Sequence, residues 1–372
     1  MVEPGVVNLD LSRAAEKYGL YFAPDPSSQK SCTIGGNVSE NSGGPHTLAY
    51  GVTSNHVTGL EIVLPDGEVL RLGGRTADVP GYDLRGLVIG SEGTFALVTE
   101  ITVKLMRLPE DVRTLLAIYD RLEDATDTVV EITARGITPA ACEMLDGWTL
   151  RAVEAYVHAG FPTDSAAVLL IEVEGLRDAA EAHAAEIRGI CMRHHAREVR
   201  EARDARERML LWKGRKEAFG AIGRVSPSYY VLDGVIPRTK LTPTLVRIAE
   251  ISQRAGLTIG NIFHAGDGNL HPLILFDHRD AGQMHRARQA GAEIMELCVE
   301  MGGTLTGEHG VGMEKNELMP LMFSETDLDL MRKVRAVFNP TGLLNPDKVL
   351  PLNKGCGETR LHPIVTSAGQ KA

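Results

Sequence analysis

The chain has 372 residues, enough for two domains of ordinary size, and 43% of them are hydrophobic while 24% are charged. These proportions are typical of folded globular proteins and exclude extensive disorder. Thirty-nine Lys and Arg residues against 49 Asp and Glu residues give a net charge of −10. This balance argues against nucleic acid as a main partner, because binding phosphates needs a basic face.

Signals for membrane insertion and secretion are absent from the sequence. No apolar run approaches the roughly 18 residues of a membrane span, and the N-terminal Met-Val-Glu-Pro-Gly has neither the basic nor the apolar region of a secretory signal. The five cysteines are widely spaced, without a Cys-x-x-Cys pair. We therefore expect reduced thiols in a cytoplasmic protein.

The first region, up to about Lys104, consists of short apolar runs separated by glycines. Two runs, 60–64 and 68–72, flank Pro65-Asp66-Gly67, in which Pro presets φ and Gly accepts a positive φ. They predict a β-hairpin, and the region as a whole predicts a mixed sheet with few helices. The polar segment 106–113, which Pro109 interrupts, is the predicted domain boundary.

Beyond this boundary, helical and strand patterns alternate. The patterns predict helices at 120–135, 178–195, 204–222, 242–255, 281–301 and 324–338, and strands at 166–175, 229–236 and twice within 257–276. Thr242 and Ser324 are the predicted N-caps of their helices. Elements interleaved in this way predict an α+β domain at 109–351, followed by a flexible polar tail at 352–372.

The sharpest local signal is the segment 261–273, where two apolar runs flank Asp267-Gly268, a dipeptide typical of tight hairpin turns. A two-residue turn would set His264 directly opposite His271, on one face and about 5 Å apart. Two imidazoles at that spacing can bind one metal ion. A pair of hairpin histidines without a ligand is an equally open alternative on this segment alone.

Three glycines, Gly307, Gly310 and Gly312, surround the second signal, the pair Glu308-His309. Adjacent side chains of an extended chain point apart, so Glu308 could face a metal while His309 faces a substrate. With the two histidines, Glu308 would complete a set of three protein ligands and leave a position open for substrate or water. A surface glycine turn is the alternative interpretation.

Small residues and glycines are concentrated in a third segment, 24–44. Its exposed backbone N–H groups suit a phosphate or a flat cofactor. The segment matches neither the G-x-G-x-x-G fingerprint nor the P-loop pattern, which argues against a nicotinamide-binding Rossmann unit and against an NTPase. Ordinary tight turns are the alternative here.

Together these segments resemble the FAD-linked oxidases of the vanillyl-alcohol-oxidase type. The resemblance extends from about residue 2 to residue 351 and rests on motifs at 2–6, 24–28, 33–37, 90–94, 264–271, 307–312 and 344–351. Within this family, the FAD-linked subunits of bacterial glycolate oxidase are most similar, with D-lactate and D-2-hydroxyglutarate dehydrogenases as cousins. The resemblance implies a partial FAD-binding domain of the PCMH type at 1–108 and an α+β FAD-linked oxidase C-terminal domain at 109–351.

The resemblance also assigns roles to individual residues. It implies that His309 is the catalytic base and that Arg215, in the pattern Trp212-x-x-Arg215, binds the substrate carboxylate, although a helical Arg is more often solvated. The implied ligands of a divalent metal, Zn or Mn, are His264, His271 and Glu308. The implied FAD contacts are Pro24, Ser27, Ser28, Gly35, Gly36, Asn41, Ser42, Glu92, Gly93, Val98 and Asn345.

The activity implied by the resemblance is oxidation of glycolate to glyoxylate by hydride transfer to FAD, assisted by the metal, with D-lactate as the alternative substrate. Leu273 stands where the hydroxyglutarate enzymes have a polar residue, which favours a short hydroxy acid. Partner subunits, including an iron–sulfur protein, would carry the electrons away. Those partners could also hold the cytoplasmic protein at the inner face of the membrane.

Family members carry an upstream segment whose Gly-rich loop cradles the FAD pyrophosphate, and this chain begins after it. The resemblance thus implies that the N-terminal part of the FAD-binding domain is missing, through a misassigned start or in a truncated relative. We expect residues 1–372 to bind FAD weakly, because a pyrophosphate needs N–H donors or cations. A flavin-free, non-catalytic subunit is the alternative from another functional class.

Overall fold

The computed structural model describes residues 1–76 and 80–352. Its N-terminal part, up to residue 107, contains a three-stranded antiparallel sheet in the order β3-β2-β4, and a second, two-stranded pairing of β1 with β5. The strands are β1 (Leu20–Tyr21), β2 (Val57–Val63), β3 (Val69–Gly73), β4 (Leu97–Val103) and β5 (Met106–Arg107). The predicted hairpin of β2 and β3 is confirmed, with Gly67 at φ 89° in its turn.

The prediction of a mixed sheet with few helices is wrong for this part. Adjacent strands run antiparallel, and short helices pack beside them: α1 (Asn8–Glu16), α2 (Ile34–Glu40), α3 (Thr47–Tyr50), α4 (Leu84–Val88) and the 3-10 turn η1 (Thr53–Asn55). Several are too short for helical periodicity to be visible in the sequence. Side-chain caps begin two of them, since Thr33 accepts from the Gly36 N–H and Asp83 from the Gly86 N–H.

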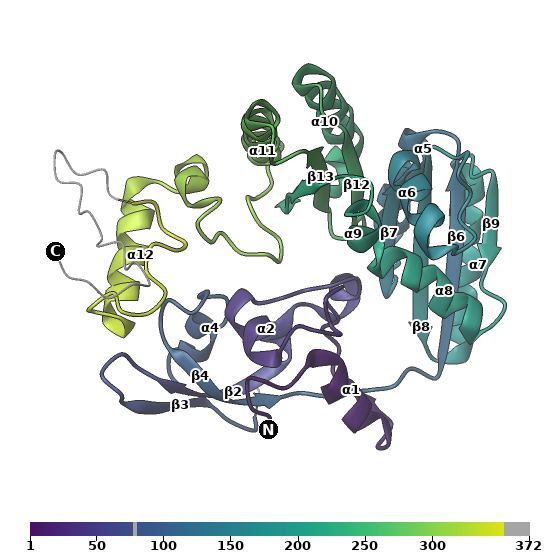
Figure 1. Ribbon diagram of the computed structural model, residues 1–372. Coiled ribbons are helices and arrows are strands. Elements are labelled where there is room, and N and C mark those ends of the chain that lie inside the picture. The colour runs from purple at the N-terminus through teal and green to yellow at the C-terminus, as the bar shows by residue number, and fades with distance from the viewer. Residues whose placement is uncertain (77–79, 353–372) are drawn as a thin grey trace.

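The C-terminal part, from residue 108, is built on one large antiparallel sheet in the order β10-β13-β12-β7-β8-β6-β9, with β11 added to β13. Its strands are β6 (Asp111–Tyr119), β7 (Ala141–Asp146), β8 (Ala167–Gly175), β9 (Glu198–Glu201), β10 (Ser228–Val231), β11 (Gly234–Val235), β12 (Ile259–His264) and β13 (Asn269–Phe276). Figure 1 shows this sheet standing beside the N-terminal part. The α+β prediction is confirmed.

Helices cover both faces of the large sheet, so its central strands are apolar on both sides. In β8, Leu169 and Ile171 pack into one core while Val168 and Leu170 pack into the other, as the two-residue period of a strand requires. One face is covered by α5 (Leu122–Ala134), α7 (Arg177–Arg193), α10 (Leu241–Ala255) and α11 (Ala281–Glu300). The other is covered by α6 (Gly147–Val157), α8 (Ala205–Lys216) and α9 (Ala218–Ile222).

The last helix, α12 (Glu325–Phe338), returns to the N-terminal part (Figure 1). Its Phe338 stacks on Phe95 with ring centroids 4.8 Å apart, and Asn339 donates to the Thr94 carbonyl. The predicted cap of this helix is confirmed, because Ser324 accepts from the Asp327 N–H and Asp327 accepts from Ser324 in return. The 3-10 turn η3 (Asn316–Leu321) precedes it.

Several predicted elements are corrected in detail. The predicted helix 204–222 is two helices that meet at Glu217, and the predicted strand 229–236 is split into β10 and β11. The predicted N-cap Thr242 is wrong: the N-cap is Lys240, because the turn η2 (Arg238–Lys240) leads directly into α10. The sequence prediction missed β6, β7, β9 and α6. Almost all of the predicted tail, 352–372, lies outside the described residues.

An ion-paired histidine joins the two parts of the chain. His46 lies 3.0 Å from the Asp25 carboxylate and, through its other ring nitrogen, 3.2 Å from the Glu172 carboxylate on β8. Its ring packs against Trp212 of α8, and Lys216 of the same helix also binds Asp25. Burial disfavours the charged imidazolium, but the two carboxylates outweigh it and raise the pKa of His46 well above its ordinary value.

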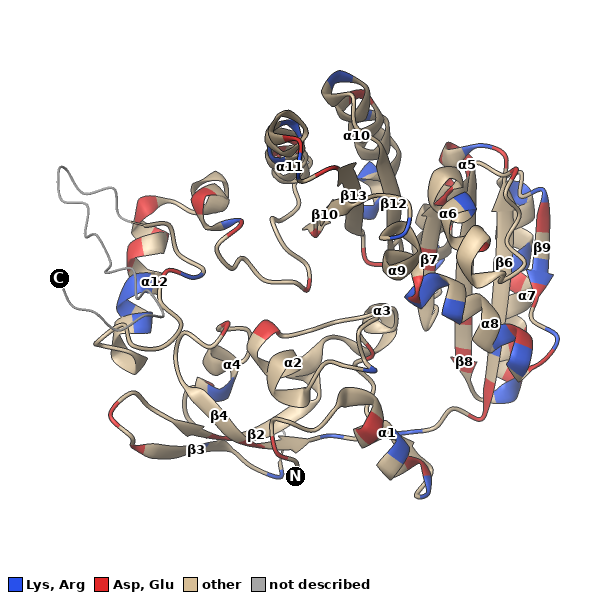
Figure 2. Ribbon diagram, in the orientation of Figure 1, with Lys and Arg blue, Asp and Glu red and all other residues tan. Residues whose placement is uncertain are grey.

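Charges of both signs are otherwise interspersed over the outer helices in the view of Figure 2, for example over α7 and α8. Among residues 1–76 and 80–352, no helix combines the length and the apolar character that crossing a bilayer requires.

We expect His46→Gln to destabilise the protein most at low pH. A histidine whose pKa is raised by folding contributes stability that is complete below its unfolded pKa of about 6.5 and is lost as the pH rises through the folded value. The substitution should lower the free energy of unfolding by about 2 kcal/mol at pH 6, and by progressively less at higher pH. Urea unfolding between pH 6 and 9 measures this, with the exposed His183→Gln as control. A pH-independent difference would contradict the ion-paired imidazolium.

Candidate active site

A cavity of about 570 Å³ lies between the two parts of the chain. The N-terminal part contributes mainly small residues of the Gly-rich segment together with Glu40, and the C-terminal part contributes the other charged residues and the aromatic residues. The predicted site residues that share this cavity are Ser27, Ser28, Gly36, Ser42, Arg215, His264, His271, Glu308 and His309. The segments that the sequence analysis treated separately therefore form one site.

The two histidines of the C-terminal wall lie on the sheet face that α6, α8 and α9 cover, next to the apolar residues of that face. His264 follows Ile262 on β12, and His271 precedes Leu273 on β13, with both apolar residues in the core under α8 and α9. Residues two apart in a strand share a face, so the two imidazoles extend the same surface. Leu273 is fully buried in that core.

The predicted register of the histidine hairpin is wrong. The turn has four residues, 265–268, rather than two, so His264 pairs with Asn269 and His271 pairs with Ile262. Gly268, at φ 73°, supplies the positive φ that this turn requires. The offset of two residues leaves both histidines on one face as diagonal neighbours, with ring centroids 5.1 Å apart.

With these histidines, Glu308 completes a group of three side chains that could hold a metal ion. Its Oε1 lies 3.3 Å from His264 Nε2 and 3.2 Å from His271 Nε2, and one candidate ligand atom from each of the three lies within 4.8 Å of the others. The Nδ1 atoms are occupied elsewhere: His264 faces the Glu143 carboxylate at 2.8 Å and His271 faces the Leu232 carbonyl at 3.2 Å. This arrangement aims both Nε2 atoms at one point, as in metal centres.

The electrostatics of this cluster favour positive charge. Burial disfavours a charged His264, but Glu143 and Glu308 outweigh burial and raise its pKa to about 10. The pKa of Glu308 is correspondingly held well below its usual range, although burial opposes this. Glu143 and Glu308 thus stabilise a positive charge on His264, which lies between them. A divalent ion would also fit this site, because two imidazoles and one carboxylate are suitable donors for it.

Arg215 of α8 is fully buried, which contradicts the solvated-helix alternative. Its Nε donates to Glu143 at 2.6 Å, and its Nη2 lies 3.5 Å from His264 Nδ1. Its Nη1 is buried and has no hydrogen-bond partner among the described residues. Leaving a charged donor unpaired is costly, so this N–H group suits an anionic group in the cavity, such as a carboxylate.

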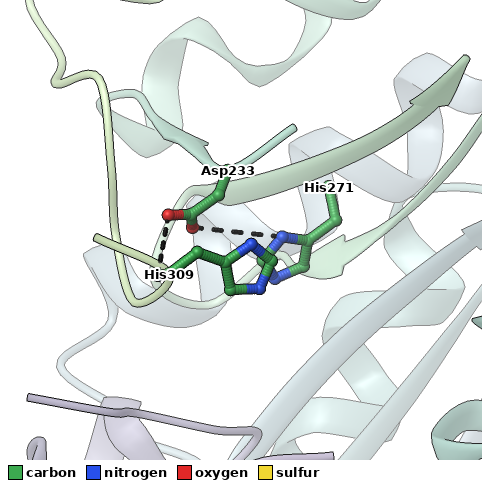
Figure 3. Close-up of side chains that lie close together, drawn as sticks. All are labelled: Asp233, His271 and His309. Atoms are coloured by element: carbon green, nitrogen blue, oxygen red, sulfur yellow. Dashed lines mark hydrogen bonds and ion pairs between the residues drawn. The ribbon is translucent and has the colours of Figure 1, made fainter. Parts of the chain in front are cut away.

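A buried carboxylate, Asp233, holds the loop that carries the Glu-His pair (Figure 3). It lies between β10 and β11, 4.0 Å from His271 Nδ1. Its oxygens accept from successive loop N–H groups and from two side chains, namely the N–H groups of Gly307, Glu308 and His309, the Thr306 hydroxyl and the Lys315 ammonium. These bonds fix the loop backbone and thereby direct both Glu308 and His309.

His309 is the most accessible group of the cluster, with a side chain 42% exposed. Its ring stacks on His271 with centroids 5.0 Å apart and an interplanar angle of 14°. The walls of the cavity desolvate the ring and lower its pKa. Figure 3 shows this stacked pair beside Asp233.

The N-terminal wall of the cavity suits a large polar cofactor. Ser27, Ser28, Gly36 and Ser42 form it together with Asn37, whose Nδ2 is buried and lacks a hydrogen-bond partner within the part of the chain that the structure describes. An orphaned amide donor in a wall of small residues fits an acceptor-rich group such as FAD.

The remaining predicted FAD contacts do not line this cavity. Pro24 accepts from Asn8, Gly35 packs against Pro4, Asn41 ends α2 and accepts from the Ser54 N–H, and Val98 lies in β4. The other three form one cluster, because the Asn345 amide donates to the Glu92 carbonyl beside Gly93. The Glu92 carboxylate accepts from the N–H groups of Val311 and Gly312, which ties this cluster to the Glu-His loop.

Sequence reasoning missed Glu143, Asp233 and Asn37. Glu143 is a lone charge in the apolar run 140–145, a signal that a buried partner exists. Asn37 directly follows Gly35-Gly36, within a segment already singled out. Asp233 offered no comparable pattern, because its partners are backbone N–H groups more than 70 residues away.

Comparisons with known proteins agree with this geometry. Residues 108–349 match the family model "FAD linked oxidases, C-terminal domain", and residues 1–73 match the model "FAD binding domain". Glycolate oxidase subunit GlcD of Escherichia coli is 47% identical over 96% of this chain and 72% of its own length. The subunit of the same name from Bacillus subtilis is 44% identical over 94% of this chain and 74% of its own.

More distant proteins share the fold. The mitochondrial D-lactate dehydrogenase [cytochrome] of Arabidopsis thaliana is 30% identical over 94% of this chain and 62% of its own length. The structure of p-cresol methylhydroxylase with substrate bound aligns with a TM-score of 0.77 at 14% identity, covering 95% of this chain and 76% of that one. By its family models and these relatives, the chain belongs to the FAD-linked oxidases.

Proposed function

We propose that the protein oxidises a short 2-hydroxy acid to the 2-oxo acid, with glycolate as the first substrate and D-lactate as the second. The observation that carries this proposal is the cavity itself. Its lining combines a buried arginine whose Nη1 is unpaired among the described residues, three side chains that could hold a metal ion and an accessible histidine, opposite small residues of the FAD-binding part. This combination supports the proposal. Relatives named as glycolate oxidase subunits and D-lactate dehydrogenases support the same chemistry.

The residues divide the reaction among themselves. Arg215 binds the substrate carboxylate through its free N–H group, and His264, His271 and Glu308 hold the divalent ion near the neighbouring hydroxyl. His309 accepts the hydroxyl proton as the general base. When bound, the metal would supply a Lewis acid for the hydroxyl, and FAD would supply the acceptor for the hydride of the α-carbon. The products are the 2-oxo acid, the reduced cofactor and one proton.

Electrons then leave through partner subunits, including an iron–sulfur protein. The support for partners is that the relatives from Escherichia coli and Bacillus subtilis are both named as subunits. We place the protein in the cytoplasm, at the inner membrane face when those partners hold it there. The four cysteines within the described ranges, Cys32, Cys142, Cys191 and Cys298, are free thiols, which supports a reducing compartment.

The direct test of the function is the flavin spectrum. Anaerobic addition of glycolate to the protein loaded with FAD and Zn²⁺ or Mn²⁺ should bleach the flavin absorbance, and D-lactate should do so more slowly. His309→Gln should retain the flavin spectrum and lose about 10²- to 10⁴-fold in the bleaching rate, as expected for loss of a general base. A loaded protein that no short 2-hydroxy acid bleaches would refute the proposed function.

The metal site is tested by His271→Ala. Removing one of the two imidazole ligands should lower both the affinity for the metal and the turnover by more than about tenfold. Zn²⁺ and Mn²⁺ are the ions to test, because imidazole suits them better than it suits Mg²⁺. Metal content after dialysis and steady-state rates measure the two effects. The matched control is His285→Ala on the exposed side of α11. Full activity of His271→Ala after chelator treatment would exclude this ligand set.

The carboxylate clamp is tested by Arg215→Lys. Lysine keeps the charge but lacks the planar fork, so KM for glycolate should rise about ten- to hundredfold with a smaller change in kcat. Arg206→Lys, the same change at an exposed position of α8, should leave both constants unchanged. Unaltered kinetics in Arg215→Lys would remove this residue from substrate binding.

A further inference from the structure

One carboxylate, that of Glu143 in β7, is shared by the two halves of the site. Its Oε2 accepts from Arg215 Nε at 2.6 Å, and its Oε1 and Oε2 lie 2.8 and 3.0 Å from His264 Nδ1. The side chain is completely buried. The clamp on α8 and the metal ligand on β12 are thus connected through a single group that belongs to neither element.

Each of these bonds fixes one degree of freedom that matters for the chemistry. Holding the proton on Nδ1 of His264 leaves the lone pair on Nε2, which faces Glu308. Holding Nε of Arg215 fixes the plane of the guanidinium, so that its unpaired Nη1 has a set direction. The carboxylate therefore sets the position of the clamp relative to the metal ligands.

We propose that Glu143 is a positioning residue that fixes the spacing between the carboxylate clamp and the metal, and thereby selects acids whose oxygen lies on the carbon next to the carboxylate. This inference rests on the proposed function of the site. An acid whose second oxygen lies one carbon further from the carboxylate would need a longer distance between Arg215 and the metal. Glu143 does not allow this longer distance while its bonds to Arg215 and His264 are both intact.

A purely structural role for Glu143 makes a different prediction. If it only neutralised the buried charge of Arg215, its loss would lower stability without changing the selectivity between acids of different length. The chain offers a matched control in Glu201 of β9, a carboxylate of the same sheet that is also ion-paired with arginine. Glu201 binds Arg113 at 3.0 Å and Arg188 at 3.2 Å, away from Arg215 and His264.

The test uses Glu143→Gln in the full chain loaded with FAD. The amide NH₂ of glutamine faces either Arg215 or His264 as a second donor, so one of the two bonds is lost. Zn²⁺ affinity is measured by competition with a chromophoric chelator. Binding of oxalate and of malonate to the protein at saturating Zn²⁺ is measured by calorimetry. These two acids are not oxidised, and they differ by one carbon in the spacing of their oxygens.

We expect Glu143→Gln to weaken Zn²⁺ binding about 10- to 100-fold, the usual effect of losing a carboxylate behind a metal-bound histidine. The preference for oxalate over malonate should also fall by at least about tenfold. Glu201→Gln should change neither quantity. Glu143→Asp, which keeps the charge but withdraws the carboxylate by one methylene, should reduce the same preference and serves if the glutamine variant does not fold.

Unchanged Zn²⁺ affinity would overturn the inference, and so would weaker Zn²⁺ binding with an unchanged oxalate preference. Both measurements are made without turnover. The Glu143 variants could show these binding shifts while glycolate fails to bleach the flavin of the wild-type protein. That combination would refute the proposed substrate alone and leave the role of Glu143 intact.

Discussion

The buried ion pair between Arg215 and Glu143 is the interaction on which the geometry of the site depends. Removing one partner of such a pair costs about 3–5 kcal/mol, because the other charge is left buried without compensation. Here the pair does not stand alone, since Glu143 also holds His264. The fold therefore retains a costly buried carboxylate on one face of the large sheet, at the point where it holds Arg215 and His264 together.

Asp233 holds the glycine-rich loop that carries Glu308 and His309. Glycines allow the loop close to the cavity but provide no side chains to pack it, and they lose more conformational entropy on folding than other residues do. The Asp233 carboxylate offsets this loss by collecting three consecutive backbone N–H groups. Glu92 holds the following turn in the same way from the N-terminal part. The Glu-His pair is thus positioned by carboxylates on both sides.

Because the cavity lies between two parts of the chain, its shape depends on how they dock. His46 and Lys216 connect the Gly-rich segment to β8 and α8, and α8 also carries Arg215. Phe95 and Phe338 join the opposite side of the interface. The contacts that hold the two parts together therefore also fix the distance between the N-terminal wall of the cavity and Arg215.

Local sequence patterns were sufficient to predict the helices α5, α7, α11 and α12, the strand β8 and the presence of a hairpin that carries the two histidines. In each case the signal is periodicity or turn chemistry within a few residues. The motifs that resemble a family also singled out His264, His271, Glu308 and His309, and the structure brings these four residues into one cavity. The turn at 265–268, by contrast, was predicted with the wrong length, because the dipeptide Asp267-Gly268 favours a two-residue turn and the pairing of β12 with both β7 and β13 overrides it.

Only the tertiary structure decided which groups support the site. The partners of Glu143 are 72 and 121 residues away, and those of Asp233 are about as distant. No local pattern records such a contact, because it arises when strands from separate segments are brought side by side in one sheet. The sequence by itself determined many of the helices, some of the strands and the reactive side chains. The order of the strands in the sheet decided which carboxylate faces which cation, since electrostatic interactions depend on distance in space and not along the chain.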